Sequence, residues 1–139
     1  MMSFEGDRRV KRARALIGVR FRAQGRDPLA GLDCVGAAAA AAGIPPEVVR
    51  RDYAMQGESL GSIERDLAGL GCRKIPAGER TEGGDVIVCR TAPAQHHLLI
   101  ATGTGFVHAD ARLGLVVERP LPVPWPVRAV WRPADEEPR

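Results

Sequence analysis

Three cysteines and three histidines are the residues of this chain best suited to nucleophilic chemistry. Asp33, directly before Cys34, favours a helix N-cap, and the six alanines at 37–42 favour a helix that Gly43 would end. Cys34 is therefore expected in the first turn of a helix. Because a helix N-terminus or a histidine partner lowers the pKa of a thiol, we expect Cys34 to be a reactive nucleophile. The alternative is a small buried core residue.

The histidines at positions 96, 97 and 108 flank a glycine-containing segment, residues 103–105, that predicts a tight hairpin turn. Pairing of the two strands would place the rings of His97 and His108 side by side at one end of a sheet. A base and the group that orients it would then meet there. Since consecutive strand residues face opposite sides, His96 would point away from a site that holds His97. The spacing alone does not distinguish a catalytic pair from histidines that only form hydrogen bonds at the edge of the sheet.

A metal site is the other chemistry that these residue types allow. Cys34, His97 and His108 are possible zinc ligands, but neither a fourth ligand nor a His-Glu motif accompanies them. The odd number and irregular spacing of the cysteines also predict no disulfide framework. We therefore expect no metal and no cofactor, with Cys72 and Cys89 in structural positions.

The elements that would position these residues follow from apolar spacing and turn residues. Helices are predicted at residues 6–17, 34–42 and 60–70, and strands at 86–89, 98–102, 106–109, 115–118 and 127–131. A loop is predicted at 19–32 and a disordered tail at 134–139. Helices followed by strands predict an α+β fold with an antiparallel sheet of about five strands. The length of 139 residues fits a single domain, residues 1–139.

The formal net charge is +3, and basic residues gather between Arg8 and Arg26. Only one aromatic residue, Phe21, lies among them, which favours a solvated helix face over a nucleic-acid site. The first residues are too charged for a signal peptide, and no segment approaches the roughly 18 apolar residues of a membrane span. We expect a protein made in the cytoplasm, with no nucleic-acid partner and no membrane span.

Five short motifs occur in a defined order along the chain. They are Gly18-Val19-Arg20-Phe21, Asp33-Cys34-Val35-Gly36, Gly84-Asp85-Val86-Ile87-Val88, His97-Leu98-Leu99-Ile100 and Val107-His108-Ala109. In this order they resemble the motifs of the NlpC/P60 cell-wall peptidases. The C-terminal part is similar to the phage and gene-transfer-agent branch of that family in Val116-Val117-Glu118, Trp125, Arg128 and Trp131-Arg132-Pro133. The resemblance covers residues 10–133.

This resemblance implies a papain-like α+β fold in which Cys34 is the nucleophile, His97 the base and His108 the residue that orients the base. The substrate would be an amide bond in a peptidoglycan stem peptide, typically the link from γ-D-glutamyl to a diamino acid. The residues implied to contact this substrate are Asp33, Phe21 and Val35.

The similarity to the phage-type branch implies delivery to the periplasm and cell wall in a phage-like tail, with tail hub or tip proteins as partners. Two alternatives stay open. The first is a catalytically weak structural component of a tail tip, because Phe21 stands where the family usually has tyrosine and Val35 where serine is commoner. The second is a cysteine amidase or acyltransferase that acts on another amide or lipid.

Overall fold

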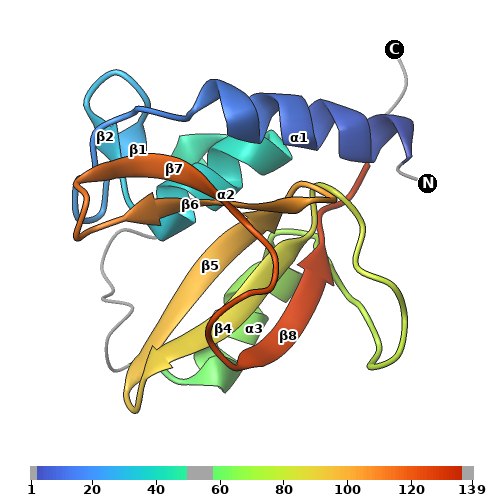
Figure 1. The fold of residues 1–139 in the computed structure, drawn as a ribbon. Coiled ribbons are helices and arrows are strands. Elements are labelled where there is room, and N and C mark those ends of the chain that lie inside the picture. Colours follow the sequence, from blue (N-terminus) through green and yellow to red (C-terminus); the bar gives the residue numbers. More distant parts are fainter. Residues whose placement is uncertain (1–2, 50–57, 136–139) are drawn as a thin grey trace.

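The computed structural model describes residues 3–49 and 58–135, and Figure 1 shows the arrangement of their helices and strands. The helices in these residues are α1 (Phe4–Ala15), α2 (Cys34–Ala42) and α3 (Leu60–Gly69), with a short 3-10 helix, η1, at Pro46–Val48. The strands are β1 (Arg26–Asp27), β2 (Gly31–Leu32), β3 (Arg73–Lys74), β4 (Val86–Ala92), β5 (Gln95–Ala101), β6 (Gly105–Asp110), β7 (Leu115–Pro120) and β8 (Val127–Arg132).

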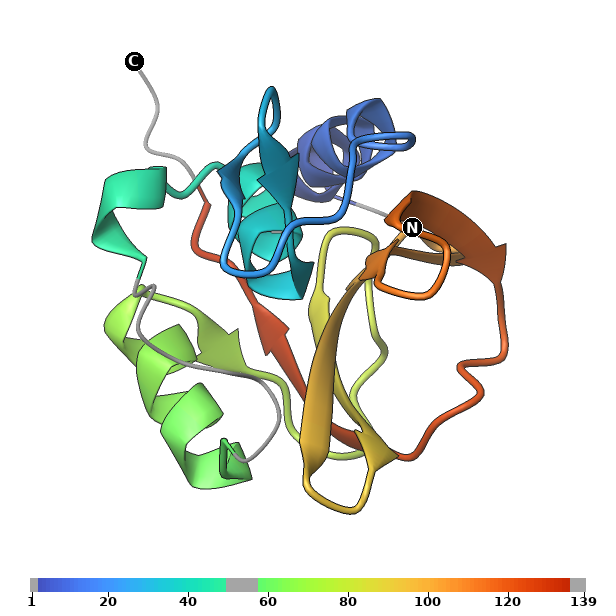
Figure 2. The same ribbon diagram turned by 90° about the vertical axis from the view of Figure 1, so that its left-hand side faces the viewer.

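Six of the strands form one antiparallel sheet in the order β3-β8-β4-β5-β6-β7, and β1 pairs with β2 in a separate hairpin. Helices α2 and α3 lie on one side of β4 and β5, while the connection from β7 to β8 lies on the other side (Figure 2). The predicted α+β fold with an antiparallel sheet is confirmed. No helix in the described part of the chain is long and apolar enough to cross a bilayer.

Each face of the sheet carries its own hydrophobic cluster, and alternate residues of β5 contribute to the two clusters. Leu98 and Ile100 belong to the cluster that includes the α2 residues, whereas Leu99 and Ala101 belong to the cluster on the opposite face. The alanines of α2 are almost all buried. Because their side chains are small, α2 packs closely against the sheet, and its first turn is held next to β5.

The glycines and the aspartate of the motifs have structural roles. A side chain at Gly36, in the first turn of α2, would collide with the backbone carbonyl of Gly25. Gly84 has a φ of +91°, which favours glycine. Asp85 is fully buried and pairs with Arg132 through two hydrogen bonds of 2.8 and 3.0 Å. Two motifs that lie far apart in the sequence therefore meet in the fold.

The predicted helices and strands are present, although many of their bounds differ by one to three residues. Ser3 caps α1, so that helix begins two residues before its predicted start at residue 6. The predicted loop at 19–32 contains the β1–β2 hairpin, and β3 adds a sixth strand at the sheet edge. These strands have two residues each, too few to show a hydrophobic period.

The predicted disordered tail falls mostly outside the described residues. Ala134 and Asp135 are described, and the Asp135 carboxylate lies 3.5 Å from Nη1 of the buried Arg9. Residues 136–139 lie beyond the described part, so disorder there stays a prediction, as does the assignment of the whole chain to one domain.

Candidate active site

Cys34 is the first residue of α2, as the sequence predicts. Asp33 has an extended backbone (φ −98°, ψ −171°), and its carboxylate accepts a hydrogen bond of 2.9 Å from the Gly36 backbone N–H. This is the geometry of a helix N-cap. The packing of α2 leaves the Cys34 side chain buried at the edge of the helix-side cluster.

The Asp33 carboxylate also connects α2 to the β1–β2 hairpin. Its Oδ1 accepts a hydrogen bond of 2.8 Å from Nη1 of Arg26, whose side chain is completely buried. Its Oδ2 accepts one of 2.9 Å from the Gln24 backbone N–H. Three donors therefore fix this carboxylate next to the nucleophile, and its contact with substrate stays a prediction.

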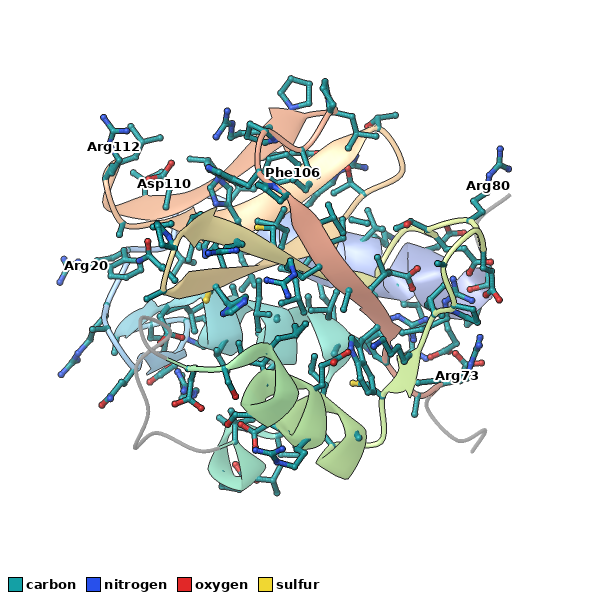
Figure 3. All side chains as sticks on the ribbon, turned by 90° about the horizontal axis from the view of Figure 1, so that it is seen from below. Arg20, Arg73, Arg80, Phe106, Asp110 and Arg112 are labelled. Atoms are coloured by element: carbon teal, nitrogen blue, oxygen red, sulfur yellow. The ribbon has the colours of Figure 1, made fainter. Side chains whose placement is uncertain are left out.

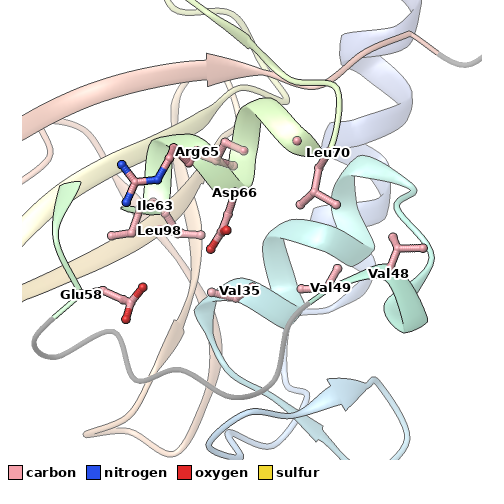
Figure 4. A pocket seen from close by; sticks show the side chains of 11 residues that line it. Val35, Val48, Val49, Glu58, Ile63, Arg65, Asp66, Leu70 and Leu98 are labelled. Atoms are coloured by element: carbon pink, nitrogen blue, oxygen red, sulfur yellow. The ribbon is translucent and has the colours of Figure 1, made fainter. Parts of the chain in front are cut away.

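One cavity of about 570 Å³ brings together five of the six predicted site residues, namely Phe21, Asp33, Cys34, His97 and His108. The sixth, Val35, lines a different cavity of about 260 Å³. Figure 4 shows its side chain on α2 facing α3. Successive helix residues are rotated by about 100° around the axis, so Val35 points away from the side on which Cys34 lies. The structure therefore does not place Val35 with the other predicted substrate contacts.

His97 and His108 are in direct contact, as the hairpin spacing predicts. A hydrogen bond of 2.8 Å joins Nε2 of His97 to Nδ1 of His108, with an angle of 76° between the ring planes. Ile100 pairs with Val107 across β5 and β6, so the two histidines are diagonal neighbours on one face of the hairpin. The ring of Trp125 packs edge-on against both imidazoles.

His96 has a different environment from His97, although it lines the same cavity. Its Nδ1 lies 3.0 Å from the backbone carbonyl oxygen of Glu58. The predicted alternation along β5 is therefore present, and only the ring of His97 reaches His108.

Burial controls the protonation of the Cys34 thiol. It raises the pKa of the Cys34 thiol to about 12, and the negative charge of Asp33 adds to this rise. A hydrogen bond from the Leu98 backbone N–H opposes the rise and shows that the thiol lies beside the residue that follows His97. The expectation that the pKa of Cys34 is lowered was wrong, because burial and the charge of Asp33 raise it.

His97 is also neutral at physiological pH. Burial lowers the pKa of His97 to about 4, and the charge of His108 would lower it further when that ring is protonated. Burial likewise lowers the pKa of His108. The Cys34 thiol and the imidazoles of His97 and His108, which line one cavity, are therefore all neutral in the free protein.

The other two cysteines are buried, as expected for structural positions. Burial raises the pKa of Cys72, and it raises that of Cys89 to about 12. Cys89 pairs with His97 across β4 and β5, and its Sγ lies 3.5 Å from the His97 carbonyl oxygen. Cys89 thus contacts the backbone of the strand that carries His97.

Sequence reasoning missed three charged residues at the site, Asp110, Arg112 and Arg119. Asp110 follows His108 by two positions on β6, and its Oδ2 lies 3.9 Å from Nε2 of that ring. Arg119 places its guanidinium 5.4 Å from the centre of the Trp125 ring, and both Arg119 and Arg112 line the cavity. Figure 3 shows Asp110 and Arg112 near each other, by the turn from β6 to β7. Residues two apart in a strand point to the same face, so the sequence could have placed Asp110 on the same face as His108.

Among residues 3–49 and 58–135, no group of three or more histidine, cysteine or acidic side chains is arranged to hold a metal ion.

No protein-family model and no curated protein matches this chain. Solved structures do match it. NlpC2 from Trichomonas vaginalis has a TM-score of 0.68 at 18% identity, over 93% of this chain and 47% of that protein. The peptidoglycan hydrolase RipB from Mycobacterium tuberculosis has a TM-score of 0.60 at 21% identity, over 96% of this chain and 66% of that protein.

A third match is the P60 domain of an antigen from M. avium subspecies paratuberculosis, with a TM-score of 0.59 and 21% identity over 96% of both chains. The present chain spans 44% and 47% of the T. vaginalis proteins NlpC1 and NlpC2, so it corresponds to part of those proteins. At these identities the likeness establishes the fold, and the chain has the mixed α+β fold of the NlpC/P60 domains.

Proposed function

We propose that this protein is a cysteine peptidase that hydrolyses an amide bond in peptidoglycan stem peptides. One observation carries the proposal: Cys34, at the N-terminus of α2, lines the same cavity as the hydrogen-bonded pair His97 and His108. The substrate class is supported by the likeness in fold to RipB and to the NlpC/P60 domain of SagA, both described as peptidoglycan hydrolases.

The hydrogen bond within the histidine pair supports a choice of atoms for the proposed reaction. Because Nε2 of His97 is bonded to His108, Nδ1 is the nitrogen that takes the thiol proton. Both groups are neutral at rest, so the proton moves to Nδ1 as Sγ of Cys34 attacks the carbonyl carbon. His97 then gives this proton to the departing amine as the C–N bond breaks. Water, deprotonated by His97, cleaves the thioester to a carboxylic acid and restores the thiol.

The oxyanion that forms during attack needs hydrogen-bond donors near the thiol. The first backbone N–H groups of a helix have no acceptor within the helix, and Cys34 supplies one of them. The helix dipole adds a favourable potential at the same point. We therefore assign the backbone N–H of Cys34 as an oxyanion donor.

The cationic side of the cavity fits a substrate that carries carboxylates. Arg112 and Arg119 line the cavity together with Gln24 and Gln95. Stem peptides that contain γ-linked D-glutamate and a diamino acid present free carboxylates next to the scissile amide. A guanidinium binds such a group with two parallel hydrogen bonds.

Delivery by a phage-like tail, and tail hub or tip partners, are part of the proposal and are supported by the C-terminal sequence resemblance. At least four residues of that segment have structural partners. Trp131 donates a hydrogen bond of 3.0 Å from Nε1 to Glu64, and Arg132 pairs with Asp85. Glu118 forms an ion pair with Arg14, and Trp125 packs against the two imidazoles. Their presence is therefore explained by the fold, and the tail context depends on the remaining positions of the segment.

Incubation of the protein with purified stem peptides, followed by mass spectrometry, tests the activity. Wild-type protein should produce two fragments that together contain one added water. Cys34→Ala should produce neither fragment and should keep its helical circular dichroism. Cys72→Ala, a change at another buried cysteine of the same hydrophobic cluster, is the matched control and should cleave like wild type. Cleavage by Cys34→Ala at a rate near wild type would refute the nucleophile, and an inactive but folded wild type would favour a structural tail component.

A further inference from the structure

The histidine pair continues into a third polar contact. Nε2 of His108 is buried and has no hydrogen-bond partner among the described residues. The carboxylate oxygen Oδ2 of Asp110 faces it at 3.9 Å. The other groups around this ring are His97, Trp125 and Phe106, and the charge of Arg119 acts on it as well. Asp110 therefore supplies the negative charge at the far end of the pair.

The Asp110 side chain is held in one orientation by the turn that follows β6. Its Oδ1 accepts hydrogen bonds from the backbone N–H groups of Arg112, at 2.9 Å, and Leu113, at 3.0 Å. This leaves Oδ2 toward His108. Although burial alone would raise the pKa of Asp110, these hydrogen bonds and the charge of Arg119 lower it, so the carboxylate is ionised at neutral pH.

We propose that Asp110 is a positioning residue that fixes the tautomers of His108 and His97. The carboxylate attracts the proton of His108 to Nε2, so Nδ1 of His108 has a lone pair and accepts a hydrogen bond from Nε2–H of His97. Nδ1 of His97 then has no proton and is ready to take one from the thiol. The importance of these proton positions for catalysis rests on the proposed peptidase function. The tautomers of the two rings do not depend on that function.

The variant Asp110→Asn separates the effect of Asp110 on the tautomers from its hydrogen bonds in the turn after β6. The asparagine Oδ1 still accepts from Arg112 and Leu113, so the turn is kept. Its Nδ2 places a donor where Oδ2 was, which favours a lone pair on Nε2 of His108 and reverses both tautomers. The matched control is Asp27→Asn, because Asp27 accepts a hydrogen bond of 2.9 Å from the Leu29 N–H in a turn outside the cavity.

The ¹⁵N NMR shifts of the imidazole nitrogens give the direct readout at neutral pH. In wild type both rings should be protonated at Nε2, and in Asp110→Asn both should be protonated at Nδ1. An aspartate in direct contact with a catalytic histidine contributes about 10⁴-fold to kcat, and at the longer distance seen here we expect kcat to fall by about 10- to 100-fold with little change in KM. Asp27→Asn should match wild type in both measurements.

Two results would overturn the inference: Nδ1-protonated His108 in wild type, or unchanged tautomers in a folded Asp110→Asn. The wild-type spectrum tests the inference even if the variant fails to fold. Should wild type show the expected tautomers but cleave no stem peptide, the role of Asp110 is supported and the proposed function fails instead.

Discussion

Nε2 of His97 and Nδ1 of His108 lie 2.8 Å apart, so a single proton occupies the space between two rings from neighbouring strands. Only one of the two nitrogens carries it, and the tautomer of one ring therefore sets the tautomer of the other. In the proposed mechanism His97 exchanges the proton with the thiol, whereas His108 acts through His97. The two residues should respond differently to substitution.

His97→Ala should lower kcat/KM by at least about 10²- to 10⁴-fold, because it removes the group that both takes and returns the proton. His108→Asn should retain more activity than His108→Ala, since the carboxamide oxygen still accepts a hydrogen bond from Nε2–H of His97. Steady-state rates on one stem peptide test this order. Equal rates for the two His108 variants would show that the second ring does not orient the base.

His96→Ala is the matched control for His97→Ala on the same strand. It removes the contact with the Glu58 carbonyl but leaves the histidine pair intact. Its kcat/KM should therefore stay well above that of His97→Ala. A larger loss of kcat/KM from His96→Ala than from His97→Ala would show that His96, and not His97, is the base.

The raised pKa of Cys34 predicts slow alkylation at neutral pH. With a thiol pKa of about 12, the thiolate fraction grows tenfold for each pH unit up to that value. The rate of iodoacetamide modification should therefore keep rising through pH 10, whereas free cysteine levels off above its pKa of about 8.5. Mass-spectrometric mapping separates Cys34 from the other two cysteines. A plateau below pH 8 would instead indicate a thiolate–imidazolium pair.

Local sequence rules predicted the parts of the site that depend on neighbours in the chain. Asp33 and Gly43 bound α2 as expected, and the turn at residues 103–105 brings His97 to His108. The pKa of Cys34 was mispredicted because it depends on burial by β5, a strand about sixty positions later, which no local pattern describes. Asp110 was missed for a similar reason: its role appears only when the direction of the His108 ring is known.

Asp33→Ala should destabilise the fold far more than an ordinary loss of an N-cap. It removes the cap of α2 and leaves the buried Arg26 guanidinium without its carboxylate, a change that costs about 3–5 kcal/mol in buried ion pairs. Ser59→Ala removes the exposed cap of α3 and should cost about 1 kcal/mol. Asp33→Asn keeps a capping oxygen and should fall between the two. Urea unfolding measures all three, and similar values for Asp33→Ala and Ser59→Ala would show that the ion pair adds nothing.

Gly36→Ala tests whether the glycine of the Asp33-Cys34-Val35-Gly36 motif is required by the fold rather than by the chemistry. An added methyl group would collide with the Gly25 carbonyl, a backbone atom held by its own hydrogen bond from the Asp33 N–H. Since the first turn of α2 is packed on the β1–β2 hairpin, neither side moves freely, and we expect a loss of about 3 kcal/mol or more in the free energy of unfolding.

Gly69→Ala is the matched control at the end of α3, where no atom lies within 4 Å of the added carbon. That change should be neutral or stabilise by up to about 1 kcal/mol. If Gly36→Ala unfolds like wild type yet loses activity, the glycine serves the thiol directly, and the packing explanation is wrong.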